Sequence, residues 1–147
     1  AFNECTGLTS VEIPNSINYI ERYVFYKCEN LKSVVIPDSV TVIGSYAFSE
    51  CKSLTNIEIP TSVDTIRNYA FEGCTSLTSI TIPNTVKEFG HGAFYNCTSL
   101  TNVYFRGTLE EWRSIRIMNA TSTPESYAEH IYVLDKNNEY VEIDINN

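Results

Sequence analysis

Five cysteines recur at an interval of 23 residues, and five phenylalanines keep the same interval three residues ahead of them. A period between 20 and 50 residues is typical of solenoids, in which each unit contacts only its neighbours. The repeat therefore predicts a stack of coils, which offers extended surfaces and no ready-made catalytic pocket. The two columns are Phe2, Phe25, Phe48, Phe71 and Phe94, and Cys5, Cys28, Cys51, Cys74 and Cys97.

The unit that starts at Leu31 shows how each coil is built. It opens with Leu-x-x-Val-x-Ile, and the alternation of Val34 and Ile36 with their neighbours predicts a short strand with these two side chains inward. A proline follows in every unit and is expected to end the strand, because proline has no N–H for the ladder. Val40 and Ile43 then lie three residues apart, which predicts a return segment with a turn of helix, 3₁₀ or irregular structure. The prolines are Pro14, Pro37, Pro60 and Pro83.

Stacked coils place equivalent residues above one another at about 4.8 Å, the spacing of neighbouring strands in a sheet. No coil buries its apolar edge without a neighbour, so the leucine, phenylalanine and cysteine columns are expected to share one continuous core. A column of hydroxyls follows the strand and is expected to bond the backbone of the turn. These residues are Ser16, Ser39, Ser62 and Thr85.

The motifs Leu-x-x-Val-x-Ile-Pro and Ile-x-x-x-Ala-Phe-x-x-Cys resemble the BspA-like leucine-rich repeats, a bacterial cell-surface family whose units share this length. The resemblance covers about residues 1–105, where Val24 replaces the usual Ala and Phe89 the usual Ile. It implies an α/β leucine-rich-repeat right-handed solenoid. It also implies a surface or secreted protein, with a role in adhesion to host proteins or to other microbes. We expect residues 1–105 to form this solenoid, with a partial first coil.

The segment after Phe105 departs from the repeat, and residues 106–147 are expected to form a C-terminal cap. Two alternating apolar segments, 130–134 and 140–145, flank five polar residues and predict a β-hairpin. A solenoid needs a cover for the exposed core and the free strand edge of its last coil.

A helix is predicted in the same cap, over about residues 109–117. Thr108 and Glu111 form a capping-box pattern at its start. Its inward face is expected to carry Leu109, Trp112, Ile115 and Arg116.

Composition limits the partners. The 147-residue chain has a net charge of −8 and only ten scattered Lys and Arg residues. Nucleic acids and anionic membranes bind clustered basic residues, so neither is expected as a partner. No apolar run approaches the roughly 20 residues of a membrane-spanning helix. Because the chain opens at Ala1-Phe2, inside a repeat unit, we expect it to be a portion of a longer protein.

The cysteines and histidines are the candidates for disulfides, metal binding or nucleophilic catalysis. Five cysteines is an odd number, and neighbouring coils would bring their Cα atoms within disulfide range. We favour buried free thiols over disulfides, because the column is apolar. Stacked thiols do not make a tetrahedral metal site, so no metal or cofactor is expected. His91 and Cys97 share a coil, but a nucleophile at Cys97 would have to differ from four equivalent cysteines. His130 is expected at the surface.

Two other patterns in the sequence each allow two interpretations. Residues 135–139 faintly resemble a calcium loop but lack its glycine and its bidentate glutamate, so a hairpin turn is favoured. Tyr23, Tyr46 and Tyr69 form a column that ends at Gly92. They either shield the phenylalanines or form a binding strip, and shielding is favoured.

The outward positions of the repeat strands form the candidate binding surface. They are polar and nearly uncharged, and curvature is expected to make this face concave. We predict a non-enzymatic recognition or adhesion module that binds a host or microbial surface protein, with Tyr104 as the best anchor by residue type. The alternative is a structural spacer that presents another domain. The candidate partner-binding residues are Glu12, Val35, Glu58, Thr81 and Tyr104.

Overall fold

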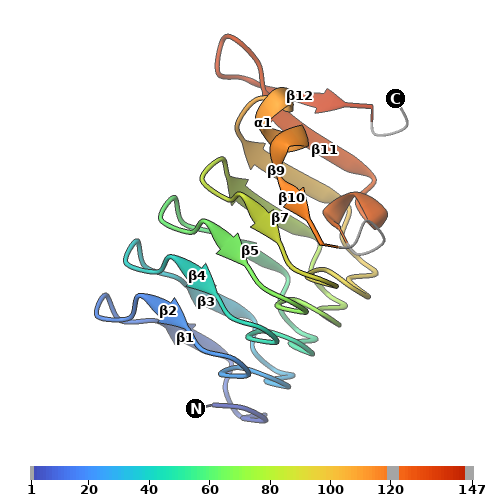
Figure 1. Ribbon diagram of the computed structural model, residues 1–147. Helices are drawn as coiled ribbons and strands as arrows, with labels where there is room; N and C mark the ends of the chain where they lie inside the picture. The colour runs from blue at the N-terminus through green and yellow to red at the C-terminus, as the bar shows by residue number, and fades with distance from the viewer. Residues whose placement is uncertain (1, 119–122, 145–147) are drawn as a thin grey trace.

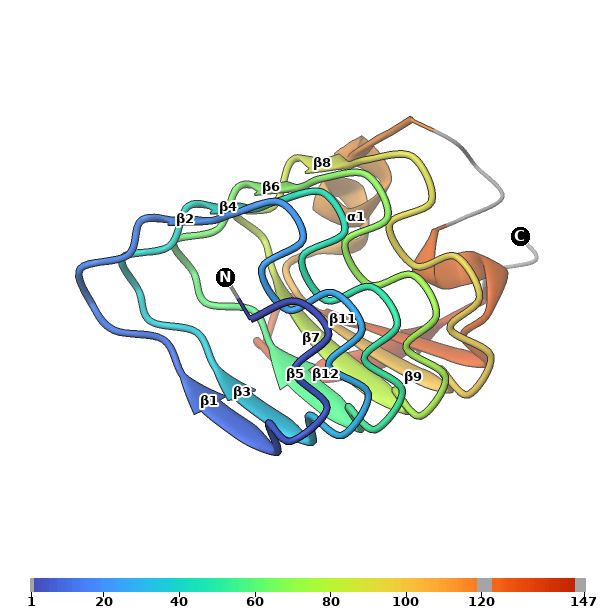
Figure 2. The ribbon, with the colours of Figure 1, turned by 90° about the horizontal axis from the view of Figure 1, so that it is seen from below.

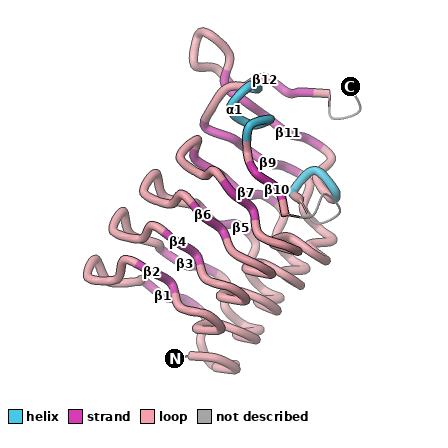
Figure 3. The backbone as a smooth tube through the Cα atoms, in the orientation of Figure 1, coloured by secondary structure: helices cyan, strands magenta, loops and turns pink. Residues whose placement is uncertain are grey.

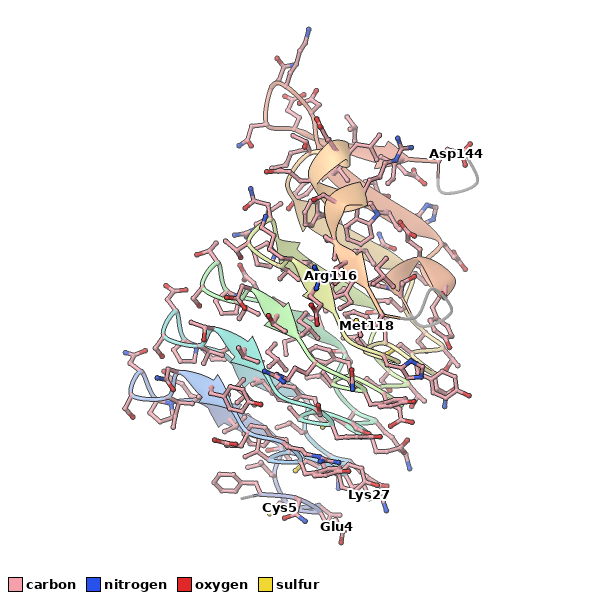
Figure 4. All side chains as sticks on the ribbon, in the orientation of Figure 1. Glu4, Cys5, Lys27, Arg116, Met118 and Asp144 are labelled. Carbon is pink, nitrogen blue, oxygen red and sulfur yellow. The ribbon has the colours of Figure 1, made fainter. Side chains whose placement is uncertain are left out.

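The computed structural model describes residues 2–118 and 123–144, and it shows the stack of coils that the repeat predicts (Figure 1). Each coil has a strand on one side and a shorter strand on the other, and Figure 2 shows these two sides along the stack. Glu4, Cys5 and Lys27 lie at the N-terminal end, and Asp144 lies at the opposite end with the cap (Figure 4). The predicted solenoid fold is confirmed.

The strands of the repeat units form one side of the stack, which we call the strand face. They pair in parallel, so that Ile80 lies opposite Val103, one repeat further on. β1 and β3 form one sheet, and β5, β7, β9, β11 and β12 form a second, so the strand face is split between β3 and β5. The strands are β1 (Ser10–Glu12), β3 (Ser33–Val35), β5 (Asn56–Glu58), β7 (Ser79–Pro83), β9 (Asn102–Arg106), β11 (His130–Leu134) and β12 (Tyr140–Ile143).

The opposite side, which we call the back, is one continuous parallel sheet. Its strands are β2 (Tyr19–Ile20), β4 (Val42–Ile43), β6 (Thr65–Ile66), β8 (Glu88–Phe89) and β10 (Arg116–Ile117).

The return segments between residues 2 and 105 consist of turns and these two-residue strands (Figure 3). The irregular alternative holds for the turns but missed the two-residue strands, which pair into one sheet, and the helical alternative is wrong. The reason is a left-handed backbone at two positions of each coil, as at Tyr46 (φ 59°) and Glu50 (φ 61°), which interrupts any helical run.

The core runs the whole length of the stack as columns of like residues. The phenylalanine rings stack nearly parallel, with centroids 5.3 Å apart between Phe25 and Phe48 and 5.4 Å apart between Phe48 and Phe71. From Phe25 onward the rings of this column are buried. Because every ring needs the ring of the next coil, stability is shared between neighbouring coils.

The cap begins with α1 (Leu109–Ser114), whose predicted capping box is present. The Thr108 hydroxyl accepts from the Glu111 N–H, and the Glu111 carboxylate accepts from the Thr108 N–H. The helix ends at Ser114, three residues before the predicted end, because the chain turns to extend the back. The Arg116 N–H donates to the Lys87 carbonyl at 2.9 Å. Arg116 is therefore exposed and not on the inward face of the helix, which corrects that prediction.

The predicted hairpin is confirmed and continues the strand face. β11 pairs in parallel with β9 and antiparallel with β12. Asp135 closes the five-residue turn, since its carboxylate accepts from the N–H groups of Asn137 and Glu139. This arrangement supports the hairpin turn over the calcium loop. A short 3₁₀ helix, η2 (Pro124–Ser126), precedes β11. Ile145 of the predicted strand lies outside the described residues.

Candidate functional site

The predicted binding residues lie in one column across the strand face. Glu12 is in register with Val35, and Glu58 is in register with Thr81, which is in register with Tyr104. Glu12, Val35 and Glu58 are exposed, and Thr81 and Tyr104 are half-buried. The structure therefore aligns all five residues, with an interruption where the sheet is split between β3 and β5.

A tyrosine cluster extends this column at the cap end. The Tyr132 ring stacks on Tyr104 with centroids 5.0 Å apart, and the Tyr140 ring meets Tyr104 edge-on at 5.4 Å. The Asn102 amide donates to the Tyr104 hydroxyl. Sequence reasoning missed Tyr132 and Tyr140 because it predicted the hairpin without its pairing to β9. The alternation in 130–134 could have placed Tyr132 on the outward face.

An ion pair crosses the middle of the strand face. Arg106 in β9 reaches past Thr81 to Glu58, with Nη2 3.0 Å from Oε1. Both side chains remain about half exposed or more, so the pair contributes little to stability. Any group that contacted Glu58 would have to compete with Arg106.

The cap hairpin carries a second, titratable pair. The imidazole Nδ1 of His130 lies 2.7 Å from the Glu142 carboxylate on the neighbouring strand, and the more distant Glu129 lies 3.9 Å from Nε2. The hydrogen bond to Glu142 raises the pKa of His130 above its usual value of 6.5. This histidine is a surface residue, as predicted.

This pair makes the cap sensitive to pH. A raised pKa in the folded state means that the pair stabilises the cap below about pH 6.5 and loses this contribution as pH rises through the raised pKa. We expect the β11–β12 amides to exchange hydrogen more slowly at pH 6 than at pH 8, after correction for the intrinsic exchange rate. Glu142→Gln and His130→Asn should each remove the difference. An unchanged pH dependence in both variants would contradict a role of this pair.

The tyrosine column forms a continuous ladder in the turns that follow the back strands. Centroids are 4.8 Å apart between Tyr23 and Tyr46 and 5.0 Å between Tyr46 and Tyr69. The Arg22 guanidinium covers the first ring at 4.7 Å. All three tyrosines have a left-handed backbone, which is unfavourable for a bulky residue and which the stacking helps to offset.

The ladder ends at Gly92, which shares the left-handed backbone (φ 62°). A Cβ there would lie 2.4 Å from the Tyr69 ring, so this ring occupies the place of a side chain. His91 meets the ring edge-on at 5.4 Å. The rings of the ladder therefore cover one another by stacking, and each ring is half-buried.

The cysteine column is reduced and packed inside the coils. Cys28, Cys51, Cys74 and Cys97 are buried, and Cys5 is partly buried. Each buried thiol donates to the carbonyl of the phenylalanine in the preceding coil, for example Cys74 to Phe48 at 3.2 Å. The predicted free thiols are confirmed within the described residues, and the disulfide alternative is wrong there.

The environment of Cys97 opposes nucleophilic chemistry. Burial raises its pKa to about 12, and its thiol donates to the Phe71 carbonyl. A catalytic cysteine needs a lowered pKa and access to substrate. His91 is exposed and contacts Tyr69. The pair therefore lacks the geometry of a catalytic dyad.

The repeat itself now decides the family. A model of the BspA type leucine rich repeat region matches residues 1–122 in six copies. The chain belongs to the BspA-type leucine-rich repeat family. No curated protein matches it by sequence.

Solved bacterial structures resemble this BspA-type chain. A leucine-rich repeat protein from Bacteroides ovatus is 31% identical over 90% of the chain, with a TM-score of 0.70. A leucine-rich repeat protein from T. pallidum is 38% identical over 71%, with a TM-score of 0.69. A leucine-rich cell surface protein from Faecalibacterium prausnitzii is 27% identical over 74%, with a TM-score of 0.67. The chain spans 32%, 49% and 35% of these proteins, respectively.

BspA-type repeats are typically non-enzymatic modules, and the described part of this chain fits that class. No group of three or more His, Cys, Asp or Glu side chains gathers there in a way that could hold a metal ion. None of the helices in residues 2–118 and 123–144 is long and apolar enough to cross a membrane.

Proposed function

We propose that the chain is a non-enzymatic protein-recognition or adhesion module of a bacterial surface or secreted protein. Its binding surface is the strand face, with Glu12, Val35, Glu58, Thr81 and Tyr104 as contact residues. The partner is a host or microbial surface protein. The extracellular location is supported by the family and by the resemblance to a cell surface protein of Faecalibacterium prausnitzii.

The single observation that carries this proposal is the contrast between the strand face and the tyrosine ladder. The strand face presents an aligned column of outward side chains that ends in the cluster of Tyr104, Tyr132 and Tyr140, where Tyr140 is 43% exposed. In the tyrosine ladder, by contrast, the ring faces are already covered by the stacked neighbouring rings. Tyrosines that combine an apolar ring with a hydroxyl are enriched among the residues that dominate protein interfaces.

The test compares two triple variants for binding to intact cells. One variant replaces Glu12, Glu58 and Tyr104 with alanine, and the other replaces Tyr23, Tyr46 and Tyr69. Labelled protein is titrated onto epithelial and bacterial cells, before and after protease treatment of the cells. We expect binding that protease abolishes, and a loss of about 2 kcal/mol or more in the strand-face variant alone.

Two outcomes would contradict the proposal. Loss of binding only in the ladder variant, with an unchanged melting curve, would move the site away from the strand face. Absence of binding in the wild type, in an array as long as the related structures, would favour the spacer. The spacer alternative is supported by the related proteins, in which the part that matches this chain makes up about a third to a half of their own length.

A further inference from the structure

One junction between coils is open on the strand face. At the other junctions, the N–H group just before the strand donates to the preceding coil, as from Thr78 to Thr55 at 2.9 Å. The N–H group just after the strand donates to the following coil, as from Ile59 to Thr81 at 3.1 Å. Neither bond has a counterpart between β3 and β5, although residues 2–118 are all described. We call this junction the seam.

A third column is interrupted at the same place. The predicted hydroxyl bonds are present from Ser39 to the Ile17 carbonyl at 2.6 Å and from Thr85 to the Val63 carbonyl at 2.8 Å. The equivalent hydroxyl of Ser62, at the seam, is buried and has no hydrogen-bond partner. Two backbone columns and one hydroxyl column of bonds are therefore interrupted at the same junction.

The back of the same junction is closed. β4 pairs with β6, the Phe48 and Phe71 rings stack at 5.4 Å, and the Cys74 thiol bonds to the Phe48 carbonyl. The two coils are thus held together at the back and lack ladder bonds on the strand face, where Cα atoms of β3 and β5 still lie within 8 Å of each other. This difference makes the seam a wedge and not a gap between separate domains.

A hollow of about 490 Å³ lies in the wedge. Val34 and Ile57 are among its apolar lining residues, and Asp38, Glu58 and Arg106 are among its polar ones. Val35 also lines the hollow and is 58% exposed. Arg106 pairs with Glu58, whereas Asp38 makes no ion pair within the described residues.

We propose that the seam binds an extended peptide segment of a protein partner, which places an aliphatic side chain in the hollow. Unpaired strand N–H and C=O groups recognise an extended main chain, as in other cases of strand addition. Alternate side chains of such a peptide point the same way. A Lys or Arg two positions from the aliphatic residue therefore reaches the Asp38 and Glu58 side of the hollow. The negative charge of the chain favours the same partner. This inference rests on the proposed function of the strand face.

The experiment uses a displayed library of random octapeptides, selected on the whole chain. Bound peptides are then compared on wild type, Val35→Arg and Ser79→Arg. Val35→Arg places a bulky cation at the hollow. Ser79→Arg places the same cation on the same face, in β7, where the ladder is intact on both sides. We expect an aliphatic–x–basic pattern, binding reduced about tenfold or more by Val35→Arg, and little change with Ser79→Arg.

Hydrogen exchange with bound peptide locates the contact. The amides of Ile36 and Thr55, which lack partners at the seam, should become protected. No enriched peptide, or enriched peptides that bind Val35→Arg as well as wild type, would overturn the proposal. Peptides that instead protect the region of Tyr104 and Tyr132 would overturn the seam and leave strand-face recognition standing. Loss of cell binding in the strand-face triple variant tests that broader proposal separately.

Discussion

Replacing Trp112 with alanine is expected to lower the free energy of unfolding by about 3–5 kcal/mol, the cost of truncating a buried tryptophan. Trp112 is 5% exposed, and its ring packs edge-on against Phe105 at 5.2 Å and against Phe89 at 6.3 Å. Its indole N–H donates to the Glu125 carboxylate, so the ring is held on both its apolar and its polar side. Without it, the core of the last coil faces water, and we expect aggregation.

Two control variants separate this role from a general effect on α1. Arg113→Ala changes an exposed neighbour on the same helix and should leave melting nearly unchanged. Trp112→Phe keeps much of the ring but removes the donor to Glu125, so its loss should be smaller than that of the alanine variant. Thermal unfolding and light scattering measure both effects. A Trp112→Ala protein that stays monomeric with unchanged melting would show that α1 does not seal the stack.

The periodic part of the structure could be predicted because each column repeats one physical choice. Phe48 and Cys51 have counterparts with the same spacing in every unit. An interpretation of one unit therefore places the phenylalanine and the cysteine of all five units. The capping box at Thr108 and the apolar alternation around Tyr132 were equally local. For this reason the strands of the strand face, the free thiols and the cap elements follow from residue types and spacing, whereas the two-residue strands of the back were not predicted.

The features that could not be predicted depend on pairing between segments. The end of α1 is set by the bond from Arg116 to Lys87, a partner far away in sequence. The tyrosine cluster exists because β11 pairs with β9. The two units on either side of the seam have equivalent core residues, Val34 and Ile57. The repeat pattern therefore does not predict the seam.

The candidate site combines both kinds of feature. Alignment of Glu58, Thr81 and Tyr104 follows directly from the repeat, and the cluster around Tyr140 and the wedge beside Val35 do not. A regular solenoid presents the same weakly distinctive surface at each coil. The places where the regularity ends, at the cap and at the seam, have shapes that the other coils lack.

The buried thiols are expected to react with a thiol reagent far more slowly than a free cysteine. Burial raises the pKa of Cys51 to about 12 from the usual 9.0, which lowers the thiolate fraction near neutral pH about a thousandfold. Burial also raises the pKa of Cys74 and of Cys28. Only Cys5, which is partly buried, should label quickly in the native state, and all five thiols should label after denaturation.

Mass spectrometry after a timed pulse of iodoacetamide at pH 8 gives the count and the site of labelling. Cys5→Ser should remove the fast phase and leave the slow one, because the remaining thiols react only when a coil opens. Cys74→Ala should weaken folding, since it leaves the Phe48 carbonyl without its second donor and empties a packed position. Rapid labelling of several thiols in folded Cys5→Ser protein, or a disulfide between neighbouring coils, would contradict the packed and reduced column. The slow phase therefore also reports how firmly each coil holds its neighbour, including the pair on either side of the seam.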